Sequence, residues 1–227
     1  MTVPQVEFSV APYRLSGTVY GTLLNHRPAL AQLGDAVNAS PYKAAPKAPV
    51  LYVKPRNTLN VHGGVVVAPA SASSLQVGAA LGLVVGKTAC AVSESEALQF
   101  LAGYTVVTDF SVPHESFYRP SVRFKALNGS CVIGPAVVEC KAVENPNALS
   151  VKVWLDDALV QSASTGDMVR DAARLLADVS EFMTLSAGDV LLLGVAAGAP
   201  LASPGQRVRV QIEGVGTQES RVEQEAE

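Results

Sequence analysis

The sequence contains little of what marks several large classes of protein. It has 17 lysines and arginines against 20 acidic residues, and the basic ones form no cluster, so the basic face that binds nucleic acid is not expected. No apolar run is long enough to span a membrane. The opening residues, MTVPQVEFSV, have neither the charged nor the apolar region of a signal peptide. These absences predict a protein with no nucleic-acid partner and no membrane partner.

Cysteine is also scarce. The three cysteines, Cys90, Cys131 and Cys140, are odd in number and match no metal-binding spacing. Without a secretion signal, reduced thiols in the cytoplasm are the simplest explanation, so a cytoplasmic location is expected.

The chain has 227 residues, enough for one domain with a substantial core. Apolar residues make up 48% of it and charged residues only 16%. This low charge is compatible with burial of some surface against another subunit. An alanine- and valine-rich composition explains it equally well.

Strand patterns dominate the sequence. They are Val-rich segments bounded by Gly, Pro or Asp, and RVRVQIEG also alternates polar and apolar residues. The expected strands are PVLYVK (49–54), GVVVAP (64–69), AALGLVVG (79–86), LSVKVWL (149–155), DVLLLG (189–194) and RVRVQIEG (207–214). The predicted fold class is therefore α+β, mainly β, with a few helices.

Three segments have helical patterns. Ser93 and Glu96 form a capping box at the start of SESEALQFLAGY (93–104). Residues 166–184 have one apolar face, with Ser164 or Thr165 as the cap and Gly188 available for a left-handed turn at the end. Residues 23–37 are a short candidate that Pro28 is expected to break early.

The two ends of the chain are expected to differ from the middle. Residues 40–49, SPYKAAPKAP, contain three prolines and predict an extended, lid-like loop. We expect an N-terminal segment over residues 1–48, one main domain over 49–218, and a polar tail over 219–227 that frays.

Several segments, in the same order, are similar to the fumarylacetoacetate hydrolase family. They are YVKPRNTL (52–59), ALGLVVGKTA (80–89), SESEALQFLAGYTVVTDFS (93–111), SFYRPSVRFKALNGSCVIGP (116–135), MTLSAGDVLLLG (183–194) and PGQRVRVQIEGVG (204–216). The match covers roughly residues 23–216. KPRNTL, SFYRP and PYKAAPKAPVLYVKP resemble most the branch of isomerase/decarboxylases of 4-hydroxyphenylacetate (homoprotocatechuate) degradation, in its N-terminal half or subunit.

The resemblance implies a rolled, mixed β-sheet core with peripheral helices, so that residues 49–218 would form the catalytic-fold domain. It also implies a divalent metal, usually Mg²⁺, that chelates a 2-oxo acid. The family's ligands are a Glu-x-Glu pair before the strand that LGLVVGK matches, and an Asp after the helix. Here the two glutamate positions are Gly78 and Ala80, and Asp109 alone matches a ligand. Because Mg²⁺ needs several oxygen ligands, metal binding by this chain is doubtful. A turn aspartate is an equally good interpretation of Asp109.

Other positions implied by the family are also changed. The family's acid–base pair, a His and a Glu, falls on Ala29 and Gln32 in NHRPALAQ, and a G-T-P loop falls on Gly194-Val195-Ala196. Asn25 is kept, and His26 stands in place of a tyrosine.

The remaining candidates are mostly cations. Lys125 and His26 are the catalytic candidates, because an ammonium can polarise a carbonyl and an imidazole can move a proton. The substrate-binding candidates are Lys54, Arg56, Tyr118 and Arg119. For each Lys or Arg a solvated surface charge is the usual alternative, and for His26 a hydrogen-bonding role. His114 is a further residue that can face the cleft, and His62 is interpreted as a turn residue.

Three hypotheses follow. The first is the N-terminal subunit of an isomerase/decarboxylase that acts on a small polycarboxylate 2-oxo acid, 5-oxopent-3-ene-1,2,5-tricarboxylate or 2-hydroxyhepta-2,4-dienedioate. The second is a silent partner of a metal-binding paralogous subunit, and the third is a dicarboxylate-binding module without catalysis. A homo-oligomer, or a hetero-oligomer with a C-terminal-half paralogous subunit, is expected.

Overall fold

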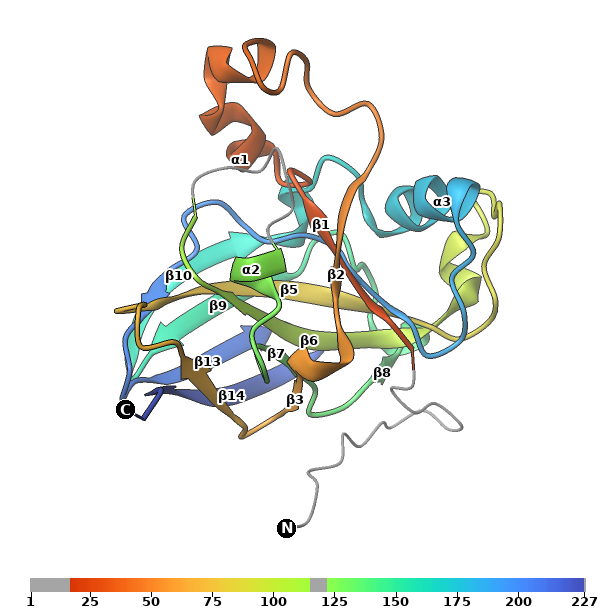
Figure 1. The fold of residues 1–227 in the computed structure, drawn as a ribbon. Coiled ribbons are helices and arrows are strands. Elements are labelled where there is room, and N and C mark those ends of the chain that lie inside the picture. The colour runs from red at the N-terminus through yellow and green to blue at the C-terminus, as the bar shows by residue number, and fades with distance from the viewer. Residues whose placement is uncertain (1–16, 115–121, 227) are drawn as a thin grey trace.

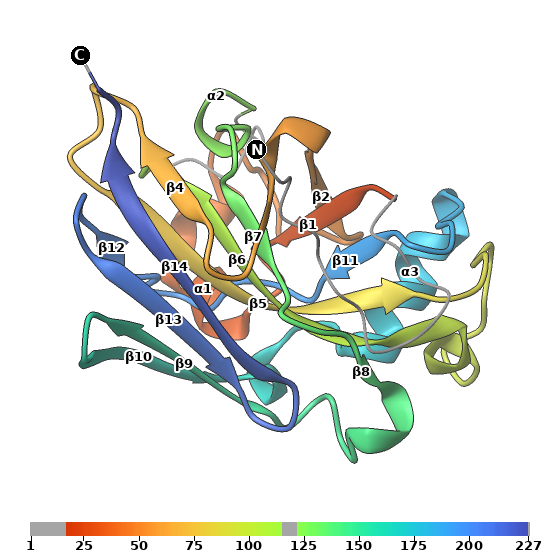
Figure 2. The ribbon, with the colours of Figure 1, turned by 90° about the horizontal axis from the view of Figure 1, so that it is seen from below.

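Two mixed β-sheets form the body of the protein (Figures 1 and 2). The computed structural model describes residues 17–114 and 122–226. The larger sheet has nine strands, seven of them in the order β2-β1-β11-β5-β6-β7-β3, while β12 pairs with β5 and β8 with β6. Its strands are β1 (Val19–Leu23), β2 (Val50–Lys54), β3 (Leu59–Val61), β5 (Leu75–Val85), β6 (Leu101–Ser111), β7 (Cys131–Ile133), β8 (Val138–Glu139), β11 (Val190–Leu192) and β12 (Leu201–Ala202).

The second sheet has five strands in the order β10-β9-β13-β14-β4. They are β4 (Val65–Ala68), β9 (Ser150–Leu155), β10 (Ala158–Ser164), β13 (Arg207–Ile212) and β14 (Gly216–Gln224). The pairs β1–β11, β3–β7 and β4–β14 are parallel and the others are antiparallel, so both sheets are mixed. The predicted mainly-β architecture with a curled mixed sheet is confirmed.

The longest pair, β5 and β6, runs through the middle of the larger sheet and fixes the geometry of the site. Every residue of β6 is buried, and so is nearly every residue of β5. Gly78 on β5 lies directly opposite Asp109 on β6, and Ala80 lies opposite Val107. Since side chains two residues apart point to the same face of a strand, these four residues share one face.

The inner faces of the two sheets enclose the main hydrophobic core. Leu75, Leu81, Leu83 and Phe110 come from the larger sheet, and Val153, Val208, Val210 and Ile212 from the smaller one. A second, smaller cluster covers the opposite face of the larger sheet; it contains Ala80, Val107 and Cys131, and the partly buried Val195 packs against it. The apolar surroundings of Asp109 belong to this second cluster.

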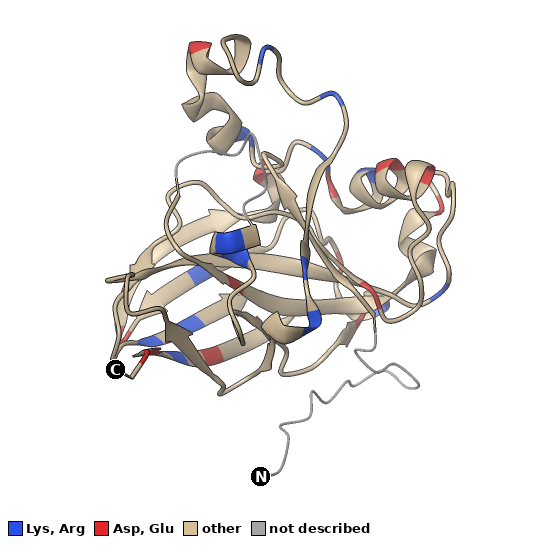
Figure 3. Ribbon diagram, viewed as in Figure 1, with Lys and Arg blue, Asp and Glu red and all other residues tan. Residues whose placement is uncertain are grey.

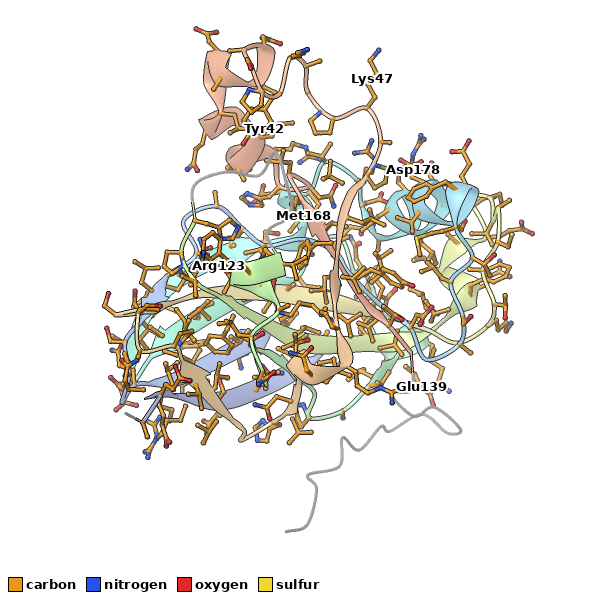
Figure 4. All side chains as sticks on the ribbon, in the orientation of Figure 1. Tyr42, Lys47, Arg123, Glu139, Met168 and Asp178 are labelled. Atoms are coloured by element: carbon orange, nitrogen blue, oxygen red, sulfur yellow. The ribbon has the colours of Figure 1, made fainter. Side chains whose placement is uncertain are left out.

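Helices lie outside the sheets. α1 (Arg27–Gln32) stands above one end of the sheets, and α2 (Val122–Lys125) is a single turn over the larger sheet (Figure 1). Tyr42 and Lys47 lie on the segment that arches from the α1 region back to β2 (Figure 4). In the described part of the chain, no helix has the length and apolar character needed to cross a membrane.

The third helix, α3 (Ala172–Phe182), differs in its start from the sequence prediction. Its apolar face is buried as expected, but it begins after Asp171, which accepts a hydrogen bond from the Arg174 amide. Ser164 caps a separate 3₁₀ turn over Thr165–Asp167. Gly188, with φ of 93°, adopts the predicted left-handed conformation.

Three other expectations are wrong. Residues 93–104 contain only a 3₁₀ turn at Ala97–Phe100, because residues from Leu101 onward pair with β5. Pro28 does not break α1; it occupies the first turn, where no amide hydrogen is needed. Most of the expected frayed tail is part of β14, which pairs with β13 as far as Arg221 and with β4 as far as Gln224.

Candidate functional site

A cavity of about 330 Å³ opens at the β1, β5 and β6 region beneath α1. It brings together many of the positions that the family resemblance singles out. The family-implied positions that line it are Asp109, Lys125, Gly78, Ala29, Gln32, Val195 and Ala196. The other lining residues are Thr22, Leu23, Leu24, Leu33, Tyr52, Gln76, Ser111, His114, Ala197, Gly198 and Ala199.

Asp109 lies at the base of this cavity and is enclosed by cations. Its Oδ1 is 2.7 Å from Lys54 Nζ, and its Oδ2 is 3.0 Å from Lys125 Nζ. Tyr52 donates its hydroxyl hydrogen to Oδ2 at 2.5 Å. Lys54 also donates to Ser130 Oγ at 2.9 Å and to the carbonyl of Lys125. Both oxygens of the carboxylate are therefore engaged.

The charges of this cluster set its protonation states. Burial by itself would raise the pKa of Asp109, but the charges of Lys125 and Lys54, and hydrogen bonds from Lys54 and Tyr52, lower this pKa to about 2. Burial, followed by the charge of Asp109, raises the pKa of Tyr52 well above its ordinary value. Burial likewise raises the pKa of Cys131, opposite Asp109 on β7, to about 12. At neutral pH Asp109 is therefore ionised, while Tyr52 and Cys131 keep their protons.

The sequence of β2 places two of these groups on one face. In VLYVK, Tyr52 and Lys54 are buried while Val53 between them is half exposed. This is the two-residue period of a strand, so both side chains point toward Asp109. Gly21 on β1, opposite Tyr52, leaves room for the ring, because a Cβ at Gly21 would lie 2.0 Å from Tyr52 Cζ.

The two lysines differ in what they offer a ligand. The Lys54 side chain is fully buried and does not line the cavity, and its ammonium is held by an ion pair with Asp109 and by hydrogen bonds to Ser130 Oγ and the Lys125 carbonyl. The Lys125 side chain is 11% exposed, lines the cavity, and lies 4.4 Å from the centre of the Tyr52 ring. α2 is basic, whereas β5 has no charged residue and β6 has only Asp109 (Figure 3). Lys125 is therefore the ammonium group that a bound molecule would meet.

His26 has a structural position at the start of α1. Its Nδ1 accepts hydrogen bonds from the backbone amides of Ala29 at 3.4 Å and Ala197 at 3.2 Å, and burial lowers its pKa. It is buried and is not among the residues that line the cavity. These contacts make it a helix cap and an anchor of the 194–199 loop, and its role in catalysis stays a prediction.

Asn25 explains why that loop is held in place. Its amide donates to the carbonyls of Leu193 at 2.7 Å and Arg170 at 2.9 Å, and it accepts from the Arg170 amide at 2.9 Å. Met168, which follows the 3₁₀ turn before α3, packs close by, below α1 in Figure 4. The end of β1, the loop and the segment before α3 are thus joined at one buried side chain.

The other sequence candidates are dispersed. Arg56 is exposed in a 3₁₀ turn (Arg56–Thr58) and does not line the cavity. Tyr118 and Arg119 lie outside the described residues. His114 does line the cavity, where its ring stacks on Phe124. His62 is confirmed as a turn residue, and it accepts from the Glu219 amide.

The residues present do not fit the metal ion that the family implies. Neither Gly78 nor Ala80 has a ligand atom in its side chain, and Ala80 lies in the apolar cluster with Val107. An added Cβ at Gly78 would lie 2.8 Å from the Asp109 carbonyl oxygen and 3.0 Å from Val195 Cγ2, so the close packing leaves little room for a longer side chain. No group of three His, Cys, Asp or Glu in the described ranges is arranged to hold a metal.

Sequence reasoning missed four polar residues of this site. Tyr52 and Ser130 hold Asp109 and Lys54, while Gln76 and Ser111 pair across β5 and β6 and line the cavity. Tyr52 could have been found from the alternation in VLYVK, because it shares the strand face of Lys54. The other three lie in segments whose contacts depend on the tertiary fold.

Curated relatives match most of the chain. The 4-hydroxyphenylacetate degradation bifunctional isomerase/decarboxylase of Escherichia coli is 40% identical over 94% of this chain and 48% of its own length. The chain thus spans about half the length of that relative. The mitochondrial oxaloacetate tautomerase of Caenorhabditis elegans is 31% identical over 80% of this chain and 83% of its own.

Solved structures have the same fold. The 5-carboxymethyl-2-hydroxymuconate delta-isomerase of Mycobacterium smegmatis superposes with a TM-score of 0.78, at 25% identity, over 97% of this chain and 83% of its own. The maleylpyruvate hydrolase of Sphingobium sp. SYK-6, solved with manganese(II) and pyruvate, gives a TM-score of 0.75 at 26% identity, over 92% of this chain and 71% of its own. The profile described as "Fumarylacetoacetate (FAA) hydrolase C-terminal" matches residues 18–223, so the chain belongs to the fumarylacetoacetate hydrolase family.

Proposed function

We propose that this chain is the N-terminal half of an isomerase/decarboxylase of 4-hydroxyphenylacetate (homoprotocatechuate) catabolism. Its substrate would be 5-oxopent-3-ene-1,2,5-tricarboxylate, 2-hydroxyhepta-2,4-dienedioate, or both. Identity of 40% to half of such an enzyme supports this assignment. The main observation in its favour is the cavity beside Lys125. The ammonium group of Lys125 faces this cavity, which is also lined by the residues at the positions that align with the family's site.

The lining of the cavity suits a short carbon chain with polar groups. Leu23, Leu24 and Val195 provide apolar surface, while Gln76 and Ser111 provide hydrogen-bonding groups. The Gln76–Ser111 pair is two residues along the strands from the Gly78–Asp109 pair, or about 7 Å. A substrate with one carboxylate near Lys125 would therefore have a second polar group within reach of this row.

Lys125 would act on the charge that develops during the reaction. Loss of the C2 carboxylate of the tricarboxylate as CO₂ sends the electron pair of the broken bond through the C3=C4 double bond to the C5 carbonyl, whose oxygen becomes an enolate, and enol–keto isomerisation passes through a related enolate. A fixed ammonium group stabilises such an oxygen most when little water surrounds it. Asp109 and Tyr52 would hold the ammonium in place and keep its orientation.

The test is turnover by the purified full chain. Each substrate is followed by its ultraviolet absorbance, with Mg²⁺ or with EDTA. The proposal expects turnover that falls at least tenfold in Lys125→Met and remains unchanged in Lys87→Met, which alters an exposed lysine that does not line the cavity. No turnover of either substrate, with or without Mg²⁺ and a C-terminal-half subunit, contradicts it.

A second candidate function is that of a silent structural partner. The observation in its favour is the poor fit of the site to a metal, together with a chain that spans half of its bifunctional relatives. In that case a metal-binding paralogous subunit would carry the chemistry, as part of a hetero-oligomer. Co-expression separates the two functions. A silent partner raises the stability or activity of the paralogue, and Lys125→Met leaves that activity unchanged.

A further inference from the structure

The Asp109 cluster has an excess of positive charge. It contains two ammonium groups, on Lys54 and Lys125, and one carboxylate. Asp109 is the single acidic residue among the described residues that line the cavity. A dication placed there would lie next to two like charges already within 3.0 Å of the carboxylate oxygens.

The ammonium group of Lys54 is a buried cation that pairs with Asp109 inside the protein. The Lys54 side chain is fully buried; it forms an ion pair with Asp109 Oδ1 and donates hydrogen bonds to Ser130 Oγ and the Lys125 carbonyl. A buried ammonium is stable only when it is paired and hydrogen-bonded in this way. Displacing the ammonium to admit a metal ion would break all three contacts. The arrangement therefore opposes replacement of the Lys54 ammonium by a metal ion.

Lys125 retains donor capacity toward the cavity. Among the described residues, Asp109 is the one hydrogen-bond acceptor of its ammonium, and the ring of Tyr52 lies against the same group. An ammonium has three N–H groups, so donors remain for an oxygen that enters from the cavity side. Because Lys54 already balances the charge of Asp109, the charge of Lys125 is available to an anion.

We propose that the Lys54–Asp109–Lys125 cluster is a metal-independent carboxylate site, in which the buried ammonium of Lys54 holds Asp109 and the ammonium of Lys125 binds the ligand. The ligand class is a short 2-oxo carboxylate or its enolate. Lys54, Asp109 and Tyr52 are positioning residues, because they act through Lys125. The inference rests on the proposed function for its ligand class, but its central statement, anion binding without a metal, can be tested without turnover.

The test measures binding of oxalate, a planar and unreactive mimic of the enolate, to the full chain by calorimetry. The expected result is one site with the same Kd in EDTA and in Mg²⁺. Lys125→Met should weaken binding by at least about tenfold, since a charge-assisted hydrogen bond is lost. Lys87→Met, at an exposed lysine that does not line the cavity, should leave Kd unchanged.

Metal affinity is measured separately, with Mn²⁺ as the probe and its electron paramagnetic resonance signal as the readout. The expected result is a free-ion signal in the presence of equimolar protein. Binding of Mn²⁺ by the chain alone, oxalate binding that requires a metal, or no oxalate binding under either condition overturns the proposal. These measurements use the unaltered chain, so they remain decisive if Lys125→Met fails to fold. Oxalate binding in EDTA without turnover contradicts the proposed function alone, whereas turnover that requires Mg²⁺ contradicts this inference alone.

Discussion

The ammonium nitrogen of Lys54 lies 2.7 Å from Oδ1 of Asp109, and neither side chain is exposed to solvent. The two residues are far apart in the sequence and come from β2 and β6. Their pairing fixes one carboxylate oxygen, and Lys125 and Tyr52 fix the other. Lys54 is thus a buried lysine that holds in place an aspartate at the base of the cavity.

Removal of Lys54 should destabilise the protein strongly. Lys54→Met leaves Asp109 buried with one ammonium partner fewer, and breaking a buried ion pair in this way costs about 3–5 kcal/mol. The double variant Lys54→Met/Asp109→Leu should recover part of this loss, because no carboxylate is then left under-compensated. The measurement is urea unfolding at pH 7.

Lys141→Met is the matched control. That side chain is 84% exposed and pairs with Glu139 on the surface, where solvent screens the pair, so its loss should change the free energy of unfolding far less than Lys54→Met does. If Lys54→Met and the control have equal effects, the buried pair is not a stabilising contact.

Acid should weaken the same cluster. The pKa of Asp109 is about 2 in the folded protein against an ordinary value of 3.8. Because the folded pKa is the lower one, the stabilisation is present above about pH 4 and is lost as the pH falls toward 2. Its size is roughly 2 kcal/mol, from a shift of nearly two pH units.

Comparison with the double variant isolates this contribution. Unfolding free energies of the unaltered chain and of Lys54→Met/Asp109→Leu are measured from pH 5 to pH 2. As the pH falls over that interval, the free energy of unfolding of the unaltered chain should decrease more than that of the double variant, because only the unaltered chain contains Asp109. A difference that stays constant with pH would show that Asp109 has an ordinary pKa.

Much of the sheet could be predicted from local patterns, because strands such as VLYVK and RVRVQIE show the period of two in their residue types. The helix expected at residues 93–104 shows where local signals fail. Its capping residues do interact, since Ser93 Oγ is 2.7 Å from Glu96 Oε2, but pairing of Leu101 with β5 ends the turn. In β14 the buried residues include Gln218 and Ser220, so polar composition concealed a strand.

The site was predictable only in part. The matched motifs singled out Asp109, Lys125 and Gly78, and all three residues line one cavity, as the family resemblance implied. The motifs could not show that Lys54 is held by Ser130 and the Lys125 carbonyl, because these partners lie more than 70 residues away. Availability to a ligand depends on such contacts, which no sequence spacing encodes.

A methyl group at Gly21 should displace Tyr52 from Asp109. An alanine Cβ would lie 2.0 Å from Tyr52 Cζ and 2.4 Å from its hydroxyl oxygen, so the ring must move. Gly21→Ala should cost about 1–3 kcal/mol, as expected of overpacking. Tyr52→Phe, which removes only the hydroxyl, should cost about 1–2 kcal/mol. Urea unfolding measures both changes.

A double-mutant cycle checks the assigned contact. In a Tyr52→Ala background the added methyl group meets no ring, so Gly21→Ala should then have little further effect. Equal costs in the two backgrounds would place the strain of Gly21→Ala somewhere other than at Tyr52.

Loss of the Asn25 side chain should loosen the loop that lines the cavity. Asn25→Ala leaves the carbonyls of Leu193 and Arg170 and the Arg170 amide without their side-chain partner, which should cost about 2–4 kcal/mol. Asn25→Asp should be no better, because its carboxylate would face two carbonyl oxygens. Asn57→Ala is the control, since that residue makes two hydrogen bonds at the exposed surface and should cost under about 1 kcal/mol.

Hydrogen exchange distinguishes loosening of the loop from general destabilisation. The Ala197 amide donates to His26 Nδ1 at the cavity wall, and His26 directly follows Asn25. In Asn25→Ala this amide should exchange faster by a larger factor than the Phe110 amide of β6, which donates to Ser130 O in the core. Because the 194–199 loop lines the cavity, oxalate affinity should fall in the same variant. Equal acceleration at both amides, with unchanged oxalate affinity, would mean that Asn25 supports the fold as a whole and has no particular role at the cavity.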